Sequence, residues 1–314
     1  MFQTPQSGTK PKPFRHLRPT RKPTTLIIGF RCTQGTVLVS DTKITDTEGG
    51  EPTYAPKISI PLQGTPFVIG AAGFTDLFHE FNRKIPIAVG QRLREYQVKN
   101  VEALTNSGME HEEAISYVLS ESLRLSQAPQ PPPIESAKAA EKPSVGLPLP
   151  YVYSAENFLD DCRGLMRGIS EQVETDSPFP LEALAIIYRA DLKNALLHYI
   201  DWDGSESTVE FYRPIGSGSP YVRMFFDRLY RFDRPLTELV SLAIFTISFT
   251  QRIAKESGVG YNDANPPQVC LVVPDGRFGS LTIKNMKEIL SDSDRQLKEF
   301  ETLIQSYTPS EVKV

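Results

Sequence analysis

Two adjacent threonines, Thr24 and Thr25, open the first hydrophobic strand that the sequence predicts. An aspartate, Asp41, closes the next predicted strand, and a lysine, Lys57, opens the third. A threonine hydroxyl is a weak nucleophile unless a base takes its proton. The same residues are also ordinary at these places, because threonine favours strands and aspartate favours turns. The threonine pair therefore either begins a strand or supplies a nucleophile.

The hydrophobic patterns around these residues predict alternating groups of strands and helices. In the first half, β-branched residues and turn glycines predict strands over 25–31, 36–41, 57–62 and 66–71, and four strands so closely spaced suggest one antiparallel sheet. Helical spacing follows over 74–85, 111–125 and 154–173. The second half predicts strands over 181–188, 195–201, 208–212 and 269–273, with helices after 219, from 235 to 258 and over 284–307. This order predicts an α+β fold, a four-layer αββα sandwich with two antiparallel sheets between helical layers.

The ends and one internal stretch differ in composition from the rest of the chain. Residues 1–24 are basic and rich in proline, which predicts a disordered leader, a propeptide or a docking arm. Seven prolines between Pro129 and Pro150 predict a surface insertion over 127–150. Neither flank of that insertion looks complete alone, so we expect a single domain over 25–314.

Overall composition excludes several functional classes. The chain has 314 residues, of which 39% are hydrophobic and 23% charged, and its net charge is −4. This charge balance gives no sign of nucleic-acid binding, and no apolar run is long enough to span a membrane. Three distant cysteines predict free thiols in a reducing compartment, hence a cytoplasmic location. The four histidines lack metal-ligand spacing, so we expect no metal site.

Several segments follow one another in a specific order. They read TTLIIGFRCTQGTVLVSDTK, APKISIP, VIGAAGFTDL, PIGSGSPYVRMFFDR and PLTELVSLAIFTISFTQRIAKESG, followed by PPQVCLVVPDG. In this order they resemble the opening hairpin, the lysine strand, the fourth strand, the glycine-serine turn and the later helix and strand of the proteasome family of N-terminal-nucleophile hydrolases. The resemblance to its β-type subunits spans about Thr24–Gly276, interrupted by the proline-rich insertion.

The resemblance assigns roles to the residues at the strand ends. Asp41 lies sixteen positions after Thr25 and Lys57 thirty-two, which are the intervals in active β-type members. Counted from Thr24, both intervals are one residue longer than in the active members. Thr25 is therefore the implied nucleophile and Thr24 the fallback. In this family the base is the freed α-amine of the threonine. Lys57 would keep that amine unprotonated by like-charge repulsion, and Asp41 would neutralise and orient Lys57.

Further site residues are implied by the same resemblance. Ser217 would support the amine, and the backbone N–H groups of Ala72 and Gly73 would form the oxyanion hole. A second supporting aspartate of the family falls near Glu256–Ser257, with Asp263 as another candidate.

The resemblance implies a threonine hydrolase that cleaves peptide bonds after removal of the leader and needs no cofactor. Its substrate would be a peptide or an unfolded protein. Its protein partners would be copies or relatives of itself in a ring, and it would bind no nucleic acid and no membrane. The sequence departs from the family in two places, because Thr24 and Ala72 replace glycines. These departures leave two alternatives open: a non-catalytic structural or gating subunit, and a stand-alone amidase or peptide transferase.

Overall fold

The fold is described from a computed structural model of the chain. It describes residues 25–44, 52–61, 67–126, 153–171, 181–189, 191–281 and 283–306. The predicted leader over 1–24, with Thr24, and the predicted insertion over 127–150 lie outside the described residues.

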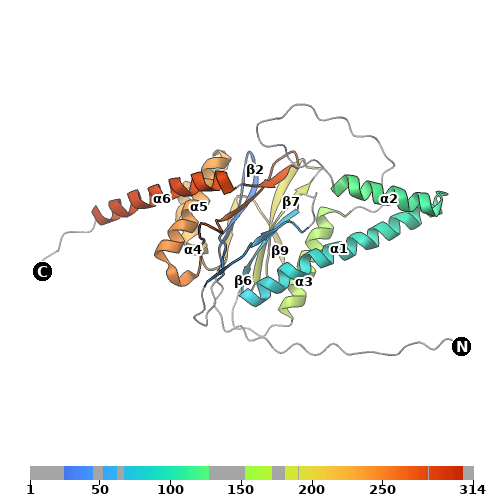
Figure 1. Ribbon diagram of the computed structural model, residues 1–314, viewed down its shortest axis with the longest axis horizontal. Helices are drawn as coiled ribbons and strands as arrows, with labels where there is room; N and C mark the ends of the chain where they lie inside the picture. The colour runs from blue at the N-terminus through green and yellow to red at the C-terminus, as the bar shows by residue number, and fades with distance from the viewer. Residues whose placement is uncertain are drawn as a thin grey trace.

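Two five-stranded sheets form the centre of the molecule (Figure 1). The first sheet has the strand order β10 (Tyr212–Ile215), β1 (Ile27–Cys32), β2 (Gly35–Ser40), β11 (Gln268–Val272) and β12 (Phe278–Ser280). The second has the order β5 (Ile58–Ser59), β6 (Phe67–Gly73), β7 (Leu181–Arg189), β8 (Asn194–Ile200) and β9 (Glu206–Val209). A separate short pair joins β3 (Lys43–Ile44) to β4 (Thr53–Tyr54). Every strand pair is antiparallel, which confirms the predicted α+β class with antiparallel sheets.

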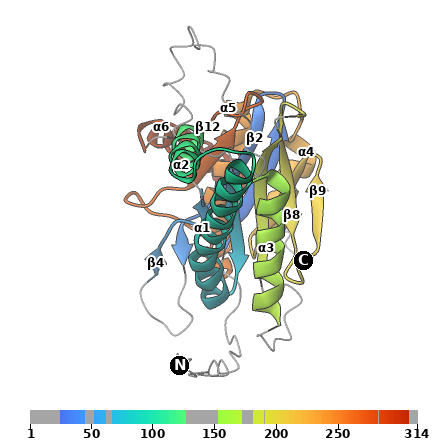
Figure 2. The ribbon, with the colours of Figure 1, turned by 90° about the vertical axis from the view of Figure 1, so that its right-hand side faces the viewer.

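Helices cover the outer face of each sheet. The described helices are α1 (Thr75–Asn106), α2 (His111–Ser126), α3 (Ala155–Ser170), α4 (Ser219–Leu229), α5 (Leu236–Ile253) and α6 (Ile283–Ser306). Helices α1 and α3 lie side by side against the second sheet (Figure 2), whereas α4 and α5 pack on the first sheet and α6 packs on α5. The far ends of α1 and α2 extend away from the sheets on one side, and α6 extends away on the other (Figure 1).

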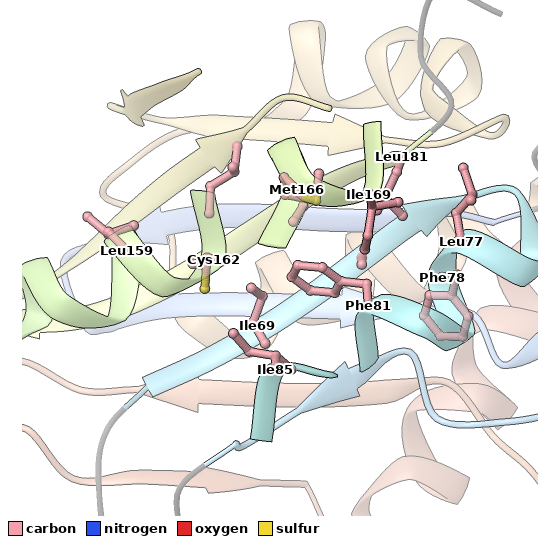
Figure 3. Close-up of a cluster of buried hydrophobic side chains, with 14 of the residues drawn as sticks. Ile69, Leu77, Phe78, Phe81, Ile85, Leu159, Cys162, Met166, Ile169 and Leu181 are labelled. Atoms are coloured by element: carbon pink, nitrogen blue, oxygen red, sulfur yellow. The ribbon is translucent and has the colours of Figure 1, made fainter. Parts of the chain in front are cut away.

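Three buried apolar clusters join these elements. One lies between α1, α3 and the second sheet, where Ile69, Phe81, Ile85, Cys162 and Met166 point toward one another (Figure 3). The second lies between the first sheet and helices α4 to α6. The third lies between the facing sheets. Alternate residues of each central strand face opposite clusters, because side chains in a strand alternate between the two faces of the sheet.

The prediction that the first four strands form one sheet was wrong. The first two strands form the predicted hairpin β1–β2, in which Cys32 pairs with Gly35, but β5 and β6 belong to the other sheet. The predicted third strand over 57–62 is reduced to Ile58–Ser59, since Pro61 cannot donate a hydrogen bond and the N–H groups of Lys57 and Ile58 donate to a side chain instead.

Strand and helix limits differ from the sequence prediction in other places. The predicted strand over 208–212 is divided, because β9 ends at Val209 and the chain enters the other sheet as β10. Strands β3, β4 and β12, each two or three residues long, were not predicted. Helix α1 continues through Pro86 to Asn106. Burial of Ile85 and Val89 on either side of Pro86 compensates for the hydrogen bond that proline removes.

Candidate active site

Thr25 and Leu26 lie at the entrance of β1, where Asp41 contacts Leu26 from the end of β2. The N–H of Asp41 donates to Leu26 O at 3.1 Å, which continues the β1–β2 pairing by one step. In return, the N–H of Leu26 donates to Asp41 Oδ1 at 2.8 Å. Both the backbone and the side chain of Asp41 therefore fix the residue that follows Thr25. Thr25 itself is 6% exposed.

The same carboxylate forms a buried ion pair with Lys57. Lys57 Nζ lies 2.8 Å from Asp41 Oδ1, and the two side chains are 1% and 0% exposed. Lys57 Nζ also donates to Lys43 O at 2.5 Å, and the N–H of Gly260 donates to Asp41 Oδ2 at 3.0 Å. Each charged group thus has polar partners besides the other, as buried charges require.

Burial acts on the pKa values of both partners. Loss of solvation raises the pKa of Asp41 and lowers the pKa of Lys57, while their mutual attraction opposes both shifts. A lysine whose pKa is lowered gives up a proton more readily than an exposed one. The cost of burying both charges offsets much of their attraction, so the pair contributes little net stability.

A turn from the far half of the chain contacts Thr25 from another direction. The N–H of Thr25 donates to Ser217 Oγ at 3.2 Å, and the Ser217 hydroxyl donates to Ser257 O at 2.8 Å. The preceding residue, Gly216, has φ +88°, and a Cβ there would lie 2.2 Å from Thr25 O. Only glycine accommodates both this conformation and this approach.

In the segment expected to hold a second supporting aspartate, the described contact to Ser217 comes from the backbone of Ser257. Ser257 contributes its carbonyl to Ser217, and its own hydroxyl donates to Ala254 O. Asp263 is exposed on a turn. The side chain of Glu256 lies outside the described residues.

The predicted oxyanion-hole residues end strand β6 close to the same turn. Ala72 and Gly73 are buried, and a Cβ at Gly216 would lie 3.2 Å from Ala72 Cβ. The structure thus brings together Thr25, Asp41, Lys57, Ser217 and Ala72, with Gly73 next in the chain. Their catalytic roles stay predictions.

Two polar residues near these groups were missed in the sequence. Gln268 begins β11, and its Oε1 accepts the N–H groups of Lys57 at 2.6 Å and Ile58 at 3.1 Å. Glu182 lies in β7, and its Oε2 accepts the N–H of Gly216 at 3.2 Å. The acidic residue inside the apolar run LEALAIIY could have indicated that Glu182 is partly buried and needs a polar partner. Gln268 gave no such signal, because a polar residue at a strand start is common.

We expect Gln268→Leu to lower the free energy of unfolding by on the order of 1–3 kcal/mol, because two backbone N–H groups lose their acceptor. Gln268→Glu retains acceptor oxygens and is the matched control. Chemical denaturation of the two variants and the parent measures the difference. Equal stability of the leucine variant and the parent would show that solvent satisfies these N–H groups.

Two other kinds of feature were searched for in the part of the chain that the structure describes. No group of three or more histidine, cysteine, aspartate or glutamate side chains is placed to bind a metal ion there. Within the same ranges, no helix is both long and apolar enough to cross a membrane.

Comparison with known proteins gives a likeness of fold. The chain is similar to the solved structure of Anbu (ancestral beta-subunit) from Yersinia bercovieri, with a TM-score of 0.54 and 14% identity. It is also similar to Anbu from Hyphomicrobium sp. strain MC1 (TM-score 0.52, 16% identity) and to the Gly-1 mutant of that protein (TM-score 0.50, 14% identity). Each comparison covers 92% of this chain and 100% of the other. No family model and no curated protein matches.

These findings correct the family assignment. Assignment to the β-type subunits of the proteasome family was wrong, because no family model matches and the similar structures are Anbu proteins. At 14–16% identity the likeness shows the fold alone. The matching segments are mostly buried strands and turns, whose residue types such a fold requires in any case.

Proposed function

We propose that this chain is a threonine hydrolase of the N-terminal-nucleophile type, which cleaves peptide bonds with Thr25 after residues 1–24 are removed. The observation that carries the proposal is the contact of one buried Asp41–Lys57 pair with the residue that follows Thr25. A buried ion pair adds little stability, and perturbed ionisable groups gather at functional sites. The position of the pair beside Thr25 therefore supports a chemical role.

The corresponding fold proposal is the four-layer αββα arrangement of N-terminal-nucleophile hydrolases. Helices on the outer face of each sheet and the likeness to Anbu support it. In such an arrangement the nucleophile begins a strand of one sheet and reacts at the end of the space between the two sheets.

The proposed reaction begins when the peptide bond before Thr25 is cut, so that Thr25 N becomes an α-amine beside Ser217 Oγ. This amine takes the proton of the Thr25 hydroxyl as that oxygen attacks the substrate carbonyl carbon. The Lys57 ammonium disfavours a protonated amine, and Asp41 orients Lys57. The N–H groups of Ala72 and Gly73 would stabilise the oxyanion. The leaving amine then takes the proton, and water hydrolyses the acyl-enzyme.

The experiment is N-terminal sequencing and intact mass of the purified protein, with peptide hydrolysis measured in parallel. We expect a chain that begins at Thr25, no hydrolysis by Thr25→Ala, and partial recovery in Thr25→Ser, which restores a hydroxyl. Thr33→Ala, in the exposed β1–β2 turn, is the matched control and should hydrolyse normally. The same hydrolysis assay on a chain released at Thr25 from a cleavable N-terminal fusion separates two failures. Activity of this chain alone would mean that only the removal of residues 1–24 had failed, whereas its inactivity would mean that the chemistry itself had failed.

A mature chain that begins at Thr24 would move the nucleophile by one residue and contradict the assignment to Thr25. Full activity of Thr25→Ala would contradict the mechanism itself. The second candidate is a non-catalytic structural or gating subunit, favoured by the exposed position of Asp263, one of the residues expected to support the nucleophile. Inactivity of the chain released at Thr25 would support that candidate.

We propose peptides or unfolded proteins as substrates and further copies or related subunits as ring partners. Native mass spectrometry measures the assembly state. An active monomer would instead favour a stand-alone amidase or peptide transferase.

A further inference from the structure

Glu182 is an acidic side chain among the apolar residues that begin strand β7. Leu184 and Ile186, two and four residues further along β7, belong to the buried cluster between the two sheets. Because side chains alternate along a strand, Glu182 belongs to this same inward face. It is half-buried, and a carboxylate in such a place requires hydrogen-bond partners.

The partners of Glu182 come from two other strands. Its Oε2 accepts the N–H of Gly216 at 3.2 Å, directly after β10, and its Oε1 accepts the Tyr199 hydroxyl of β8 at 2.9 Å. The Arg213 guanidinium lies 3.4 Å from the centre of the Tyr199 ring and attracts the carboxylate. The cross-strand neighbour of Glu182 on β6 is Ala72. The carboxylate therefore joins β7 and β8 to the turn that contacts Thr25.

The turn transmits this contact to the candidate nucleophile. Gly216 lies so close to Thr25 O that a Cβ would overlap it at 2.2 Å, and the next residue, Ser217, accepts the N–H of Thr25. A displacement of Gly216 would move both contacts at once.

We infer that Glu182 is the second acidic group of the site, a positioning residue that fixes Gly216 and, through it, the Ser217 hydroxyl at Thr25. The inference rests on the proposed function for its catalytic consequence. It places the second acid on β7, in place of the segment around 256–263 where the sequence led us to expect one. Glu182 contacts the turn and not the reacting atoms, so it acts through Ser217.

Charges around Glu182 determine when it ionises. Burial raises the pKa of Glu182, the N–H of Gly216, the Tyr199 hydroxyl and Arg213 lower it, and Asp201 adds to the rise. As the pH falls through the folded-state pKa, the carboxylate takes up a proton and one of its two acceptor oxygens becomes a donor. The hydrogen bond to Gly216 N–H therefore changes over this pH range.

The first test follows the Gly216 amide by NMR, since its shift reports Glu182 without reference to activity. Labelling with ¹³C-carbonyl isoleucine and ¹⁵N-glycine selects Ile–Gly pairs, of which the sequence has three, at Gly29, Gly70 and Gly216. We expect one of the three resonances to titrate in the acid range and to stop titrating in Glu182→Gln. In Tyr199→Phe the titration should move to higher pH, because the carboxylate loses a donor.

The second test measures peptide hydrolysis by the mature chain. Glu182→Leu should lower kcat by about 10–100-fold with a smaller effect on KM, since a displaced turn misplaces Thr25. Glu182→Gln keeps an acceptor oxygen for Gly216 and should recover most of kcat. Glu206→Gln is the matched control: this carboxylate also has a side-chain partner, His198, but lies outside the site. It should hydrolyse like the parent.

The absence of any titrating Ile–Gly resonance, or a titration unchanged in Glu182→Gln, would overturn the inference whatever the activity. Equal kcat for Glu182→Leu and the parent would overturn the positioning role. Failure of the proposed function can be told apart from failure of this inference, because it would appear as unchanged hydrolysis by Thr25→Ala.

Discussion

We expect Lys57→Met to abolish the proposed hydrolysis and to lower the free energy of unfolding by about 3–5 kcal/mol, because it leaves the Asp41 carboxylate buried without its counter-charge. Asp41 is fully buried and keeps only the N–H groups of Leu26 and Gly260 as partners. Methionine matches the length of lysine, so the loss reports charge more than volume. Chemical denaturation and peptide hydrolysis by the mature chain measure the two effects.

A double-mutant cycle separates the ion pair from the rest of the site. Asp41→Asn combined with Lys57→Met should cost less stability than the two single changes added together, with a coupling energy on the order of 0.5–3 kcal/mol. Lys84→Met is the matched control, because Lys84 forms an ion pair with Glu80 on the surface of α1 at 2.9 Å. Such an exposed pair contributes about 0.3–0.5 kcal/mol. A cost for Lys57→Met no larger than that of the control would contradict a buried pair, and retained turnover would contradict the mechanism.

Gly216→Ala should lower hydrolysis by about 100-fold or more and destabilise the protein. The added Cβ would lie 2.2 Å from Thr25 O, a backbone atom that cannot move aside without shifting β1. The positive φ of +88° adds strain of about 1–2 kcal/mol for a residue with a side chain. Both effects act on the residue proposed as nucleophile.

Helix α3 provides the control for this change. A Cβ at Gly164 would meet no atom within 4 Å. Gly164→Ala should therefore retain the stability and activity of the parent. Thermal unfolding and peptide hydrolysis compare the two variants. If both alanines had the same small effect, Gly216 would not set the position of Thr25.

The fold was predictable from the sequence where a pattern is long and apolar. The β1–β2 hairpin and helices α3, α5 and α6 were found because their hydrophobic periods extend over many residues. The division of strands between the two sheets was not predictable, because both sheets bury both of their faces and use the same residue types. Strands of two or three residues, such as β4 and β12, are too short for any period to be visible.

Part of the site was predictable for a different reason. Asp41 and Lys57 were identified because their intervals from Thr25 resemble those of active β-type subunits. The β1–β2 hairpin brings Asp41 to Leu26, and Lys57 reaches Asp41 from the other sheet.

Gln268 was missed because tertiary packing alone brings it to the site. The acid in the run LEALAIIY was visible, but the sequence does not show that its partner is Gly216. Asp263 is exposed on a turn, because sequence distance from a motif does not fix which way a turn faces.

The contact between Thr25 N and Ser217 Oγ joins residues 192 positions apart. Contacts of such long range form late in folding, because the intervening chain must first be ordered. Thr25 emerges from the ribosome early, and Ser217, Gly260 and Gln268 follow only after most of the chain has been made. If Thr25 is the proposed nucleophile, its site is complete only after these later segments have folded. Folding of the whole chain would then have to precede the removal of residues 1–24 that the proposed function requires.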